Sequence, residues 1–182
     1  MVQLYDVISN GYNNKNSKIK GFEKDNSLSN DNNQLYVDHK NKKLIYNTTG
    51  THKKSDWGAN FYLGLGKLKN TKRYMEAHKG IRDAKNKYAG YNSVITGDSL
   101  GGAIARGISS QGDKILTLNT ASTLGEASKR RETNNRVEWD PISLMMGGTK
   151  PLKNKVKTPT LFGGLYDSHI PSSIKDHNIK II

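Results

Sequence analysis

The sequence predicts an α/β protein with a mostly parallel sheet and helices on both of its faces. Two observations indicate this fold class. Helix-like and strand-like segments alternate from residue 71 to residue 118, and the β-branched run Val94-Ile95-Thr96 leads directly into a G-x-S-x-G turn. Because crossover helices pack on the faces of a parallel sheet, such alternation is typical of this architecture.

Length and composition predict a single domain over residues 1–182. Residues 9–33 are rich in Asn, Ser and Lys, so we expect residues 1–33 to form a loosely structured N-terminal segment. Next comes a hairpin signal, because strand-like residues 35–38 and 43–46 flank a polar turn. The triplet Thr49-Gly50-Thr51 ends the second of these strands.

The clearest helix is predicted for residues 71–88, where Thr71 is a candidate cap and the apolar residues share one face. The rest of the pattern predicts, in order, a strand at 93–96, a helix through about Ser109, a strand at 114–118, a strand at 136–139 and a short helix opened by Asp140-Pro141. Ser99, Asp140 and the loop at Thr51 each follow a predicted strand. We therefore expect all three at the carboxyl edge of the sheet, where active groups gather in such folds.

The turn around Ser99 is the feature that points to chemistry. A serine on a tight strand-to-helix corner projects its hydroxyl where an acyl carbon can reach it, and glycines two residues away on each side permit close packing. The backbone N–H of Leu100 would lie at the start of a helix, where a developing oxyanion is stabilised. The pattern therefore predicts Ser99 as a nucleophile.

A serine nucleophile needs an imidazole to accept its proton. In one common arrangement the order along the chain is serine, acid, histidine, and only His169 and His177 follow Ser99. His169 is favoured because it lies in a loop-like segment, and His177 near the end of the chain stays the alternative base. The three histidines before Ser99 are expected at the surface, and these are His39, His52 and His78.

The acid is predicted to be Asp140, which follows a strand-like segment and precedes a proline. A structural alternative is that Asp140 only caps the helix that Pro141 begins. Asp113, in the polar turn before a strand, is a second candidate, whereas Asp167 is too close to His169 in sequence to pair easily.

The formal net charge is +13, with lysines scattered along the chain. Such scatter favours a solvated basic surface that could contact anionic membranes, and it does not favour a nucleic-acid site. The absence of cysteine excludes disulfides and thiolate metal sites. Neither a secretory signal nor a transmembrane segment is visible, so we expect a cytoplasmic or virion-associated protein.

Three segments together resemble the class 3 lipases, a branch of the α/β-hydrolase superfamily. Residues 97–103 (GDSLGGA) resemble the family's G-H-S-L-G-G-A turn, and residues 46–57 (YNTTGTHKKSDW) resemble its strand that ends in R-G-T or R-G-S with an Asp-Trp pair beyond. Asp140-Pro141 resembles the family's acid followed by proline. The likeness runs from about Leu35 to Leu144, with a weaker match at His169, and extends faintly to compact viral lipase-like proteins.

This resemblance implies a minimal lipase core that hydrolyses esters of acyl lipids without a metal or cofactor. Ser99 would be the nucleophile, Asp140 the acid and His169 the base, with Leu100 and Thr51 forming the oxyanion hole. Asp56 and Trp57 would brace the oxyanion loop.

Two departures from the family pattern bear on activity. Asp98 replaces the usual histidine before the serine, and Thr49 replaces the usual arginine before Gly50. They motivate an alternative function, a catalytically weak or inactive lipase-like scaffold that serves as a structural or binding protein, for example within a virus particle. A nucleic-acid-binding protein is the third and weakest hypothesis.

Overall fold

The computed structural model describes residues 1–13, 19–51, 66–121, 131–137, 154–156 and 179–181. Within this part of the chain the strands form one sheet of seven, in the order β1-β2-β3-β4-β5-β6-β7. The strands are β1 (Glu23–Lys24), β2 (Asn33–Asp38), β3 (Lys43–Thr48), β4 (Asn92–Asp98), β5 (Lys114–Leu118), β6 (Glu132–Val137) and β7 (Asn154–Val156). From β3 to β7 every neighbouring pair is parallel, whereas β1–β2 and β2–β3 are antiparallel. The sheet is therefore mixed and mostly parallel.

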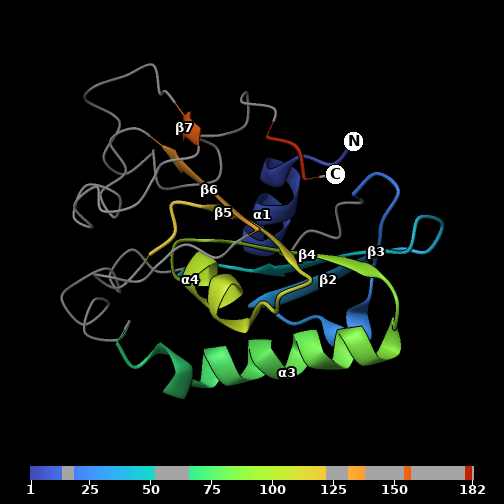
Figure 1. The fold of residues 1–182 in the computed structure, drawn as a ribbon, viewed down its shortest axis with the longest axis horizontal. Helices are drawn as coiled ribbons and strands as arrows, with labels where there is room; N and C mark the ends of the chain where they lie inside the picture. Colours follow the sequence, from blue (N-terminus) through green and yellow to red (C-terminus); the bar gives the residue numbers. More distant parts are fainter. Residues whose placement is uncertain (14–18, 52–65, 122–130, 138–153, 157–178, 182) are drawn as a thin grey trace.

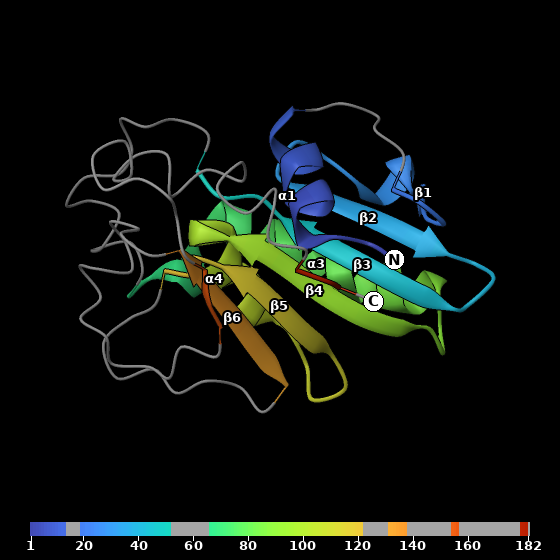
Figure 2. The ribbon, with the colours of Figure 1, turned by 90° about the horizontal axis from the view of Figure 1, so that it is seen from above.

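Helices cover both faces of the sheet, as predicted (Figures 1 and 2). Helix α1 (Leu4–Asn13) lies on one face, and α3 (Lys72–Lys87) and α4 (Ser99–Ile108) lie on the other. The chain also forms two short 3-10 helices. One is η1 (Asn26–Leu28), between β1 and β2, and the other is η3 (Leu68–Asn70), just before α3. One apolar cluster fills each interface: Val7, Ile8, Tyr36, Ile45 and Leu116 belong to the first, and Leu35, Tyr46, Ala77, Ile95 and Ile104 to the second.

Helix α3 forms where the sequence predicts it. The Thr71 hydroxyl accepts a hydrogen bond from Tyr74 N–H at 3.2 Å and so caps the first turn. Ala77, Ile81 and Ala84 are buried on one face, which confirms the predicted apolar stripe.

The N-terminal segment differs from the expectation of loose structure. In α1 the apolar side chains of Leu4, Val7 and Ile8 are spaced to share one face, and each is fully buried against the sheet. The helix is also fixed to the other end of the chain, because Leu4 N–H donates to the Ile179 carbonyl and Ile181 N–H to the Val2 carbonyl. The abundance of Asn, Ser and Lys obscured this short amphipathic pattern.

Strand β6 begins four residues earlier than predicted. Its sequence Glu-Thr-Asn-Asn-Arg-Val carries no apolar alternation, so the strand pattern was not evident. Pairing with β5 determines its position: Leu118 lies opposite Asn135, and Asn119 N–H donates to the Asn135 carbonyl at 2.8 Å.

Candidate active site

The chain turns sharply between β4 and α4 at Ser99. Strand β4 ends at Asp98, helix α4 begins at Ser99, and the φ angle of Ser99 is 51°. Residues other than glycine adopt this left-handed region rarely, because the Cβ atom meets the backbone. A strained residue at a strand-to-helix corner is the geometry that G-x-S-x-G turns use to present a serine.

Close packing around the turn explains its glycines. A Cβ atom on Gly101 would collide with the Thr48 carbonyl oxygen and lie 2.5 Å from the carbonyl carbon of Thr49. On Gly97 it would lie 2.6 Å from Gly101 backbone atoms. The Thr48 hydroxyl donates to the Gly101 carbonyl oxygen at 2.6 Å, which ties the end of β3 to the start of α4.

Among the described residues, three hydroxyls at the carboxyl ends of neighbouring parallel strands have no hydrogen-bond partner. They belong to Thr51 after β3, Ser99 after β4 and Thr120 after β5, and each oxygen is buried. In proteins, buried hydroxyls rarely lack a hydrogen-bond partner unless a ligand or a water molecule supplies one. Ser99 as a residue is 1% exposed, so its hydroxyl lies inside a covered site.

Leu100 and Thr51 carry the two backbone groups predicted to hold an oxyanion. Leu100 lies in the first turn of α4, whose N–H groups have no intrahelical partner and carry the positive end of the helix dipole. Thr51 lies three residues beyond the end of β3, which is paired in parallel with β4 up to Thr48 and Gly97. The two residues therefore follow adjacent strands at one sheet edge.

The Asp98 carboxylate is held by two donors on the β3 side of the turn. The Tyr12 hydroxyl of α1 donates to Asp98 Oδ2 at 2.5 Å, and Gly50 N–H donates to Asp98 Oδ1 at 3.1 Å. Burial raises the pKa of the Tyr12 phenol, and the nearby Asp98 charge raises it further, so this hydroxyl keeps its proton and donates. Asp98 thus supports the backbone at Gly50.

Arg73, in the first turn of α3, supports the same loop from the other side. Its Nη2 donates to the Thr49 carbonyl at 2.6 Å, and Nη1 and Nη2 each lie 3.3 Å from the Gly50 carbonyl oxygen. Burial lowers the pKa of the Arg73 guanidinium, and the negative charge of Asp98 opposes that shift. Sequence reasoning missed Tyr12 and Arg73, although a carboxylate beside a buried serine signals that partners are needed.

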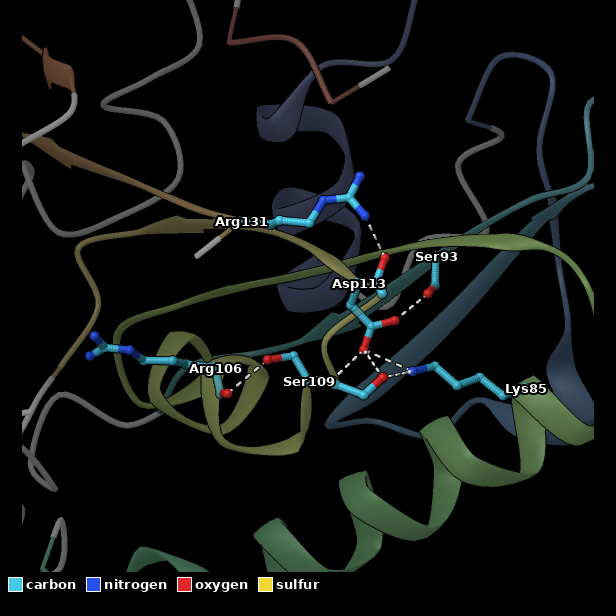
Figure 3. A network of polar contacts seen from close by, with 8 residues as sticks. Lys85, Ser93, Arg106, Ser109, Asp113 and Arg131 are labelled. Carbon is cyan, nitrogen blue, oxygen red and sulfur yellow. Dashed lines mark hydrogen bonds and ion pairs between the residues drawn. The ribbon is translucent and has the colours of Figure 1, made fainter. Parts of the chain in front are cut away.

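Asp113, the second acid candidate, lies at the edge of the sheet opposite to Ser99, and Figure 3 shows its contacts with Lys85 and Ser93. It precedes β5, whereas Ser99 follows the parallel strand β4. Its carboxylate accepts hydrogen bonds from Lys85 Nζ at 2.8 Å, from the Ser110 N–H at 2.6 Å and from the Ser93 hydroxyl. Asp113 therefore joins α3, β4 and β5 and takes no part in the site at Ser99.

Other predicted site residues fall outside the part that the structure describes. These are Asp140, His169, His177, Asp56 and Trp57. His39 and His78 are exposed, as expected for surface histidines, and His52 is also outside the described residues. Across the described ranges there is no group of His, Asp and Glu side chains that could hold a metal ion. None of the helices described there is long and apolar enough to cross a membrane.

Comparison with solved structures places the fold among lipases. The triacylglycerol lipase of Penicillium expansum matches with a TM-score of 0.55 and 16% sequence identity, over 92% of this chain and 79% of the lipase. The Rhizomucor miehei lipase in complex with its propeptide matches with a TM-score of 0.52 and 14% identity, over 80% of this chain and 62% of that one. Lip2 lipase of Yarrowia lipolytica gives a TM-score of 0.45 and 16% identity, over 70% and 60%.

The likeness at these identities shows a lipase-like α/β fold. No model of a protein family matches the sequence, and no curated protein matches it. The chain spans about 60% of the Yarrowia lipase and 62% of the Rhizomucor lipase. These matching structures come from fungi and give no support to the predicted viral character.

Proposed function

We propose that this protein is a serine hydrolase that cleaves carboxylic esters of acyl lipids. The observation that carries the proposal is the buried hydroxyl of Ser99 at a left-handed strand-to-helix corner, in the first turn of α4, where no described residue forms a hydrogen bond with it. The lipase-like fold supports a lipid ester as the substrate class.

In the proposed reaction, Ser99 Oγ attacks the carbonyl carbon of the ester while His169 accepts the hydroxyl proton. Asp140 orients that imidazole and stabilises its cation. The carbonyl oxygen becomes an oxyanion, and the N–H groups of Leu100 and Thr51 donate to it. The imidazolium then gives its proton to the departing alcohol, which leaves an acyl-enzyme. The same histidine deprotonates a water molecule that attacks the acyl carbon, and it returns this proton to Ser99 Oγ as the carboxylic acid leaves.

Ester hydrolysis by a Ser99→Ala variant tests this proposal. A short-chain p-nitrophenyl ester and an emulsified acylglycerol are the substrates. The matched control is Ser27→Ala, because Ser27 is exposed and contacts Lys87 at the far end of α3 from Arg73. We expect Ser99→Ala to reduce kcat by about a thousandfold or more, with an unchanged melting temperature. Equal rates in Ser99→Ala and the parent would contradict the proposal.

The rival function is a lipase-like scaffold without catalysis. The 1% exposure of Ser99 favours it, because a hydroxyl that is never uncovered cannot attack an ester. A folded parent protein with no esterase activity on either substrate would support the scaffold.

A further inference from the structure

The loop at Gly50 is held at both of its flanking peptide groups by charged side chains. Gly50 N–H donates to the Asp98 carboxylate, and the carbonyls of Thr49 and Gly50 accept from the Arg73 guanidinium. These two side chains come from β4 and α3, so the loop is fixed by two elements distant in sequence. Hydrogen bonds to ionised groups are about twice as strong as neutral ones, so this loop is unusually restrained.

The peptide group that joins Gly50 to Thr51 carries the N–H that would donate to the oxyanion. It contains both the Gly50 carbonyl and the Thr51 N–H, and no cis peptide bond occurs in the described chain. In a trans peptide the N–H points away from the C=O. A guanidinium on the Gly50 carbonyl therefore directs the Thr51 N–H to the side away from α3, and it polarises the peptide so that this N–H donates more strongly.

The fit around Gly50 leaves no room for a side chain at this position. A Cβ atom on Gly50 would collide with the Tyr12 hydroxyl and lie 2.7 Å from Asp98 Oδ2. Thr49 is also fixed, because its N–H donates to the Asn32 carbonyl at 2.9 Å. The backbone on both sides of Gly50 is thus determined by close contacts.

We propose that Arg73 and Asp98, with Tyr12 behind Asp98, are positioning residues that orient the Thr51 N–H toward the oxyanion formed at Ser99. The role rests on the proposed esterase activity and adds residues that lie outside the serine, acid and histidine set. It also gives the two departures from the family pattern a function. Arg73 from α3 supplies the guanidinium that Thr49 lacks, and Asp98 supplies an anchor for Gly50 in place of the histidine.

The test compares Arg73→Met and Tyr12→Phe with matched controls on the same helices. Arg82→Met is the control for α3, because its side chain is 63% exposed and forms a long ion pair with Asp83, at 3.8 Å. Tyr5→Phe is the control for α1, where Tyr5 packs against the apolar cluster. Tyr12→Phe keeps the ring and loses only the hydroxyl, so it reports on positioning even if Arg73→Met fails to fold.

Two readouts separate orientation from folding. The first is kcat and KM on a p-nitrophenyl ester, and the second is the inhibition constant of a trifluoromethyl ketone, which forms an oxyanion adduct with a serine. We expect Arg73→Met to lower kcat by about a hundredfold and Tyr12→Phe by about tenfold. Removing an oxyanion donor costs about a hundredfold to a thousandfold, and a donor that is only misdirected should cost the same or less. KM should stay within about twofold of the parent value. The inhibition constant of the ketone should rise by about the same factor by which kcat falls.

The outcomes separate the positioning role from the esterase activity. Variants that lose melting temperature while kcat and ketone affinity stay at the parent values would overturn the positioning role and leave the esterase proposal standing. A folded parent that neither hydrolyses the ester nor binds the ketone would overturn the esterase proposal and the positioning role with it.

Discussion

Asp98 Oδ1 accepts a hydrogen bond from Gly50 N–H at 3.1 Å, although the two residues are 48 positions apart. This contact joins the serine turn to the loop after β3, so the two halves of the proposed oxyanion hole are linked directly. Because Asp98 also accepts from Tyr12, its carboxylate is held on the side of Gly50.

Gly101→Ala should destabilise the protein by about 3 kcal/mol or more, because the new methyl group would meet backbone atoms of Thr48 and Thr49 that cannot move aside. Gly112→Ala is the control, since nothing lies within 4 Å of its Cβ position. Urea unfolding of both variants measures the difference. Equal stabilities would show that α4 is not pressed against the end of β3.

Glu132→Ala should cost about 3–5 kcal/mol, because it leaves Arg106 buried without its carboxylate. The two side chains form an ion pair at 3.1 Å and are 3% and 2% exposed, which links α4 to β6. Glu76→Ala removes an exposed pair with Lys72 and should have little effect. Chemical denaturation checks the contrast, and a comparable loss in both variants would argue against the buried pair.

Acid should weaken the network at Asp113. Burial by itself would raise the pKa of Asp113, but hydrogen bonds from Lys85, Ser93 and Ser110 outweigh it and hold the pKa below 3.8. A carboxyl group whose pKa is lower in the folded protein stabilises the fold at pH values above its pKa in the unfolded chain. It loses this contribution as the pH falls toward its pKa in the folded protein. The parent should therefore lose stability below about pH 4, and Asp113→Asn should lose less over the same range. The measurement is the free energy of unfolding of both proteins between pH 6 and pH 3. An equal decline in the parent and in Asp113→Asn would contradict this role of Asp113.

The basic surface should bind anionic membranes in a salt-dependent way. The net charge is +13, and Lys67, Lys69 and Lys72 are exposed near the start of α3, the end that approaches Gly50. Cosedimentation with phosphatidylglycerol vesicles should be strong at low salt and fall steeply at high salt. Neutral phosphatidylcholine vesicles are the control. Equal binding to both would mean that charge does not guide the contact.

The periodic elements were predictable from the sequence, whereas the contacts at the site were not. Strand β5 and helix α3 form where apolar spacing and the Thr71 cap place them, since local pattern determines such elements. Helix α1 and strand β6 were missed or misplaced because their polar composition hides them, and pairing or burial against distant residues stabilises them.

The support of Gly50 by Tyr12 and Arg73 depends entirely on tertiary structure. Tyr12 is 86 residues from Asp98, and Arg73 is 23 residues from Gly50. No motif spacing connects such residues, so only the fold reveals that they meet. The resemblance in sequence marked Thr49 and Asp98 as departures from the class 3 lipase pattern, but it could not show which side chains surround them.

Covalent labelling of Ser99 tests the central proposal most directly. The folded parent is treated with a fluorophosphonate probe, digested, and analysed by mass spectrometry for the modified peptide, with Ser99→Ala and heat-denatured parent as controls. We predict one phosphonyl group on Ser99 of the folded parent and none in either control. A folded parent that stays unlabelled, or that is labelled equally when Ser99 is alanine, would contradict the assignment of Ser99 as the nucleophile.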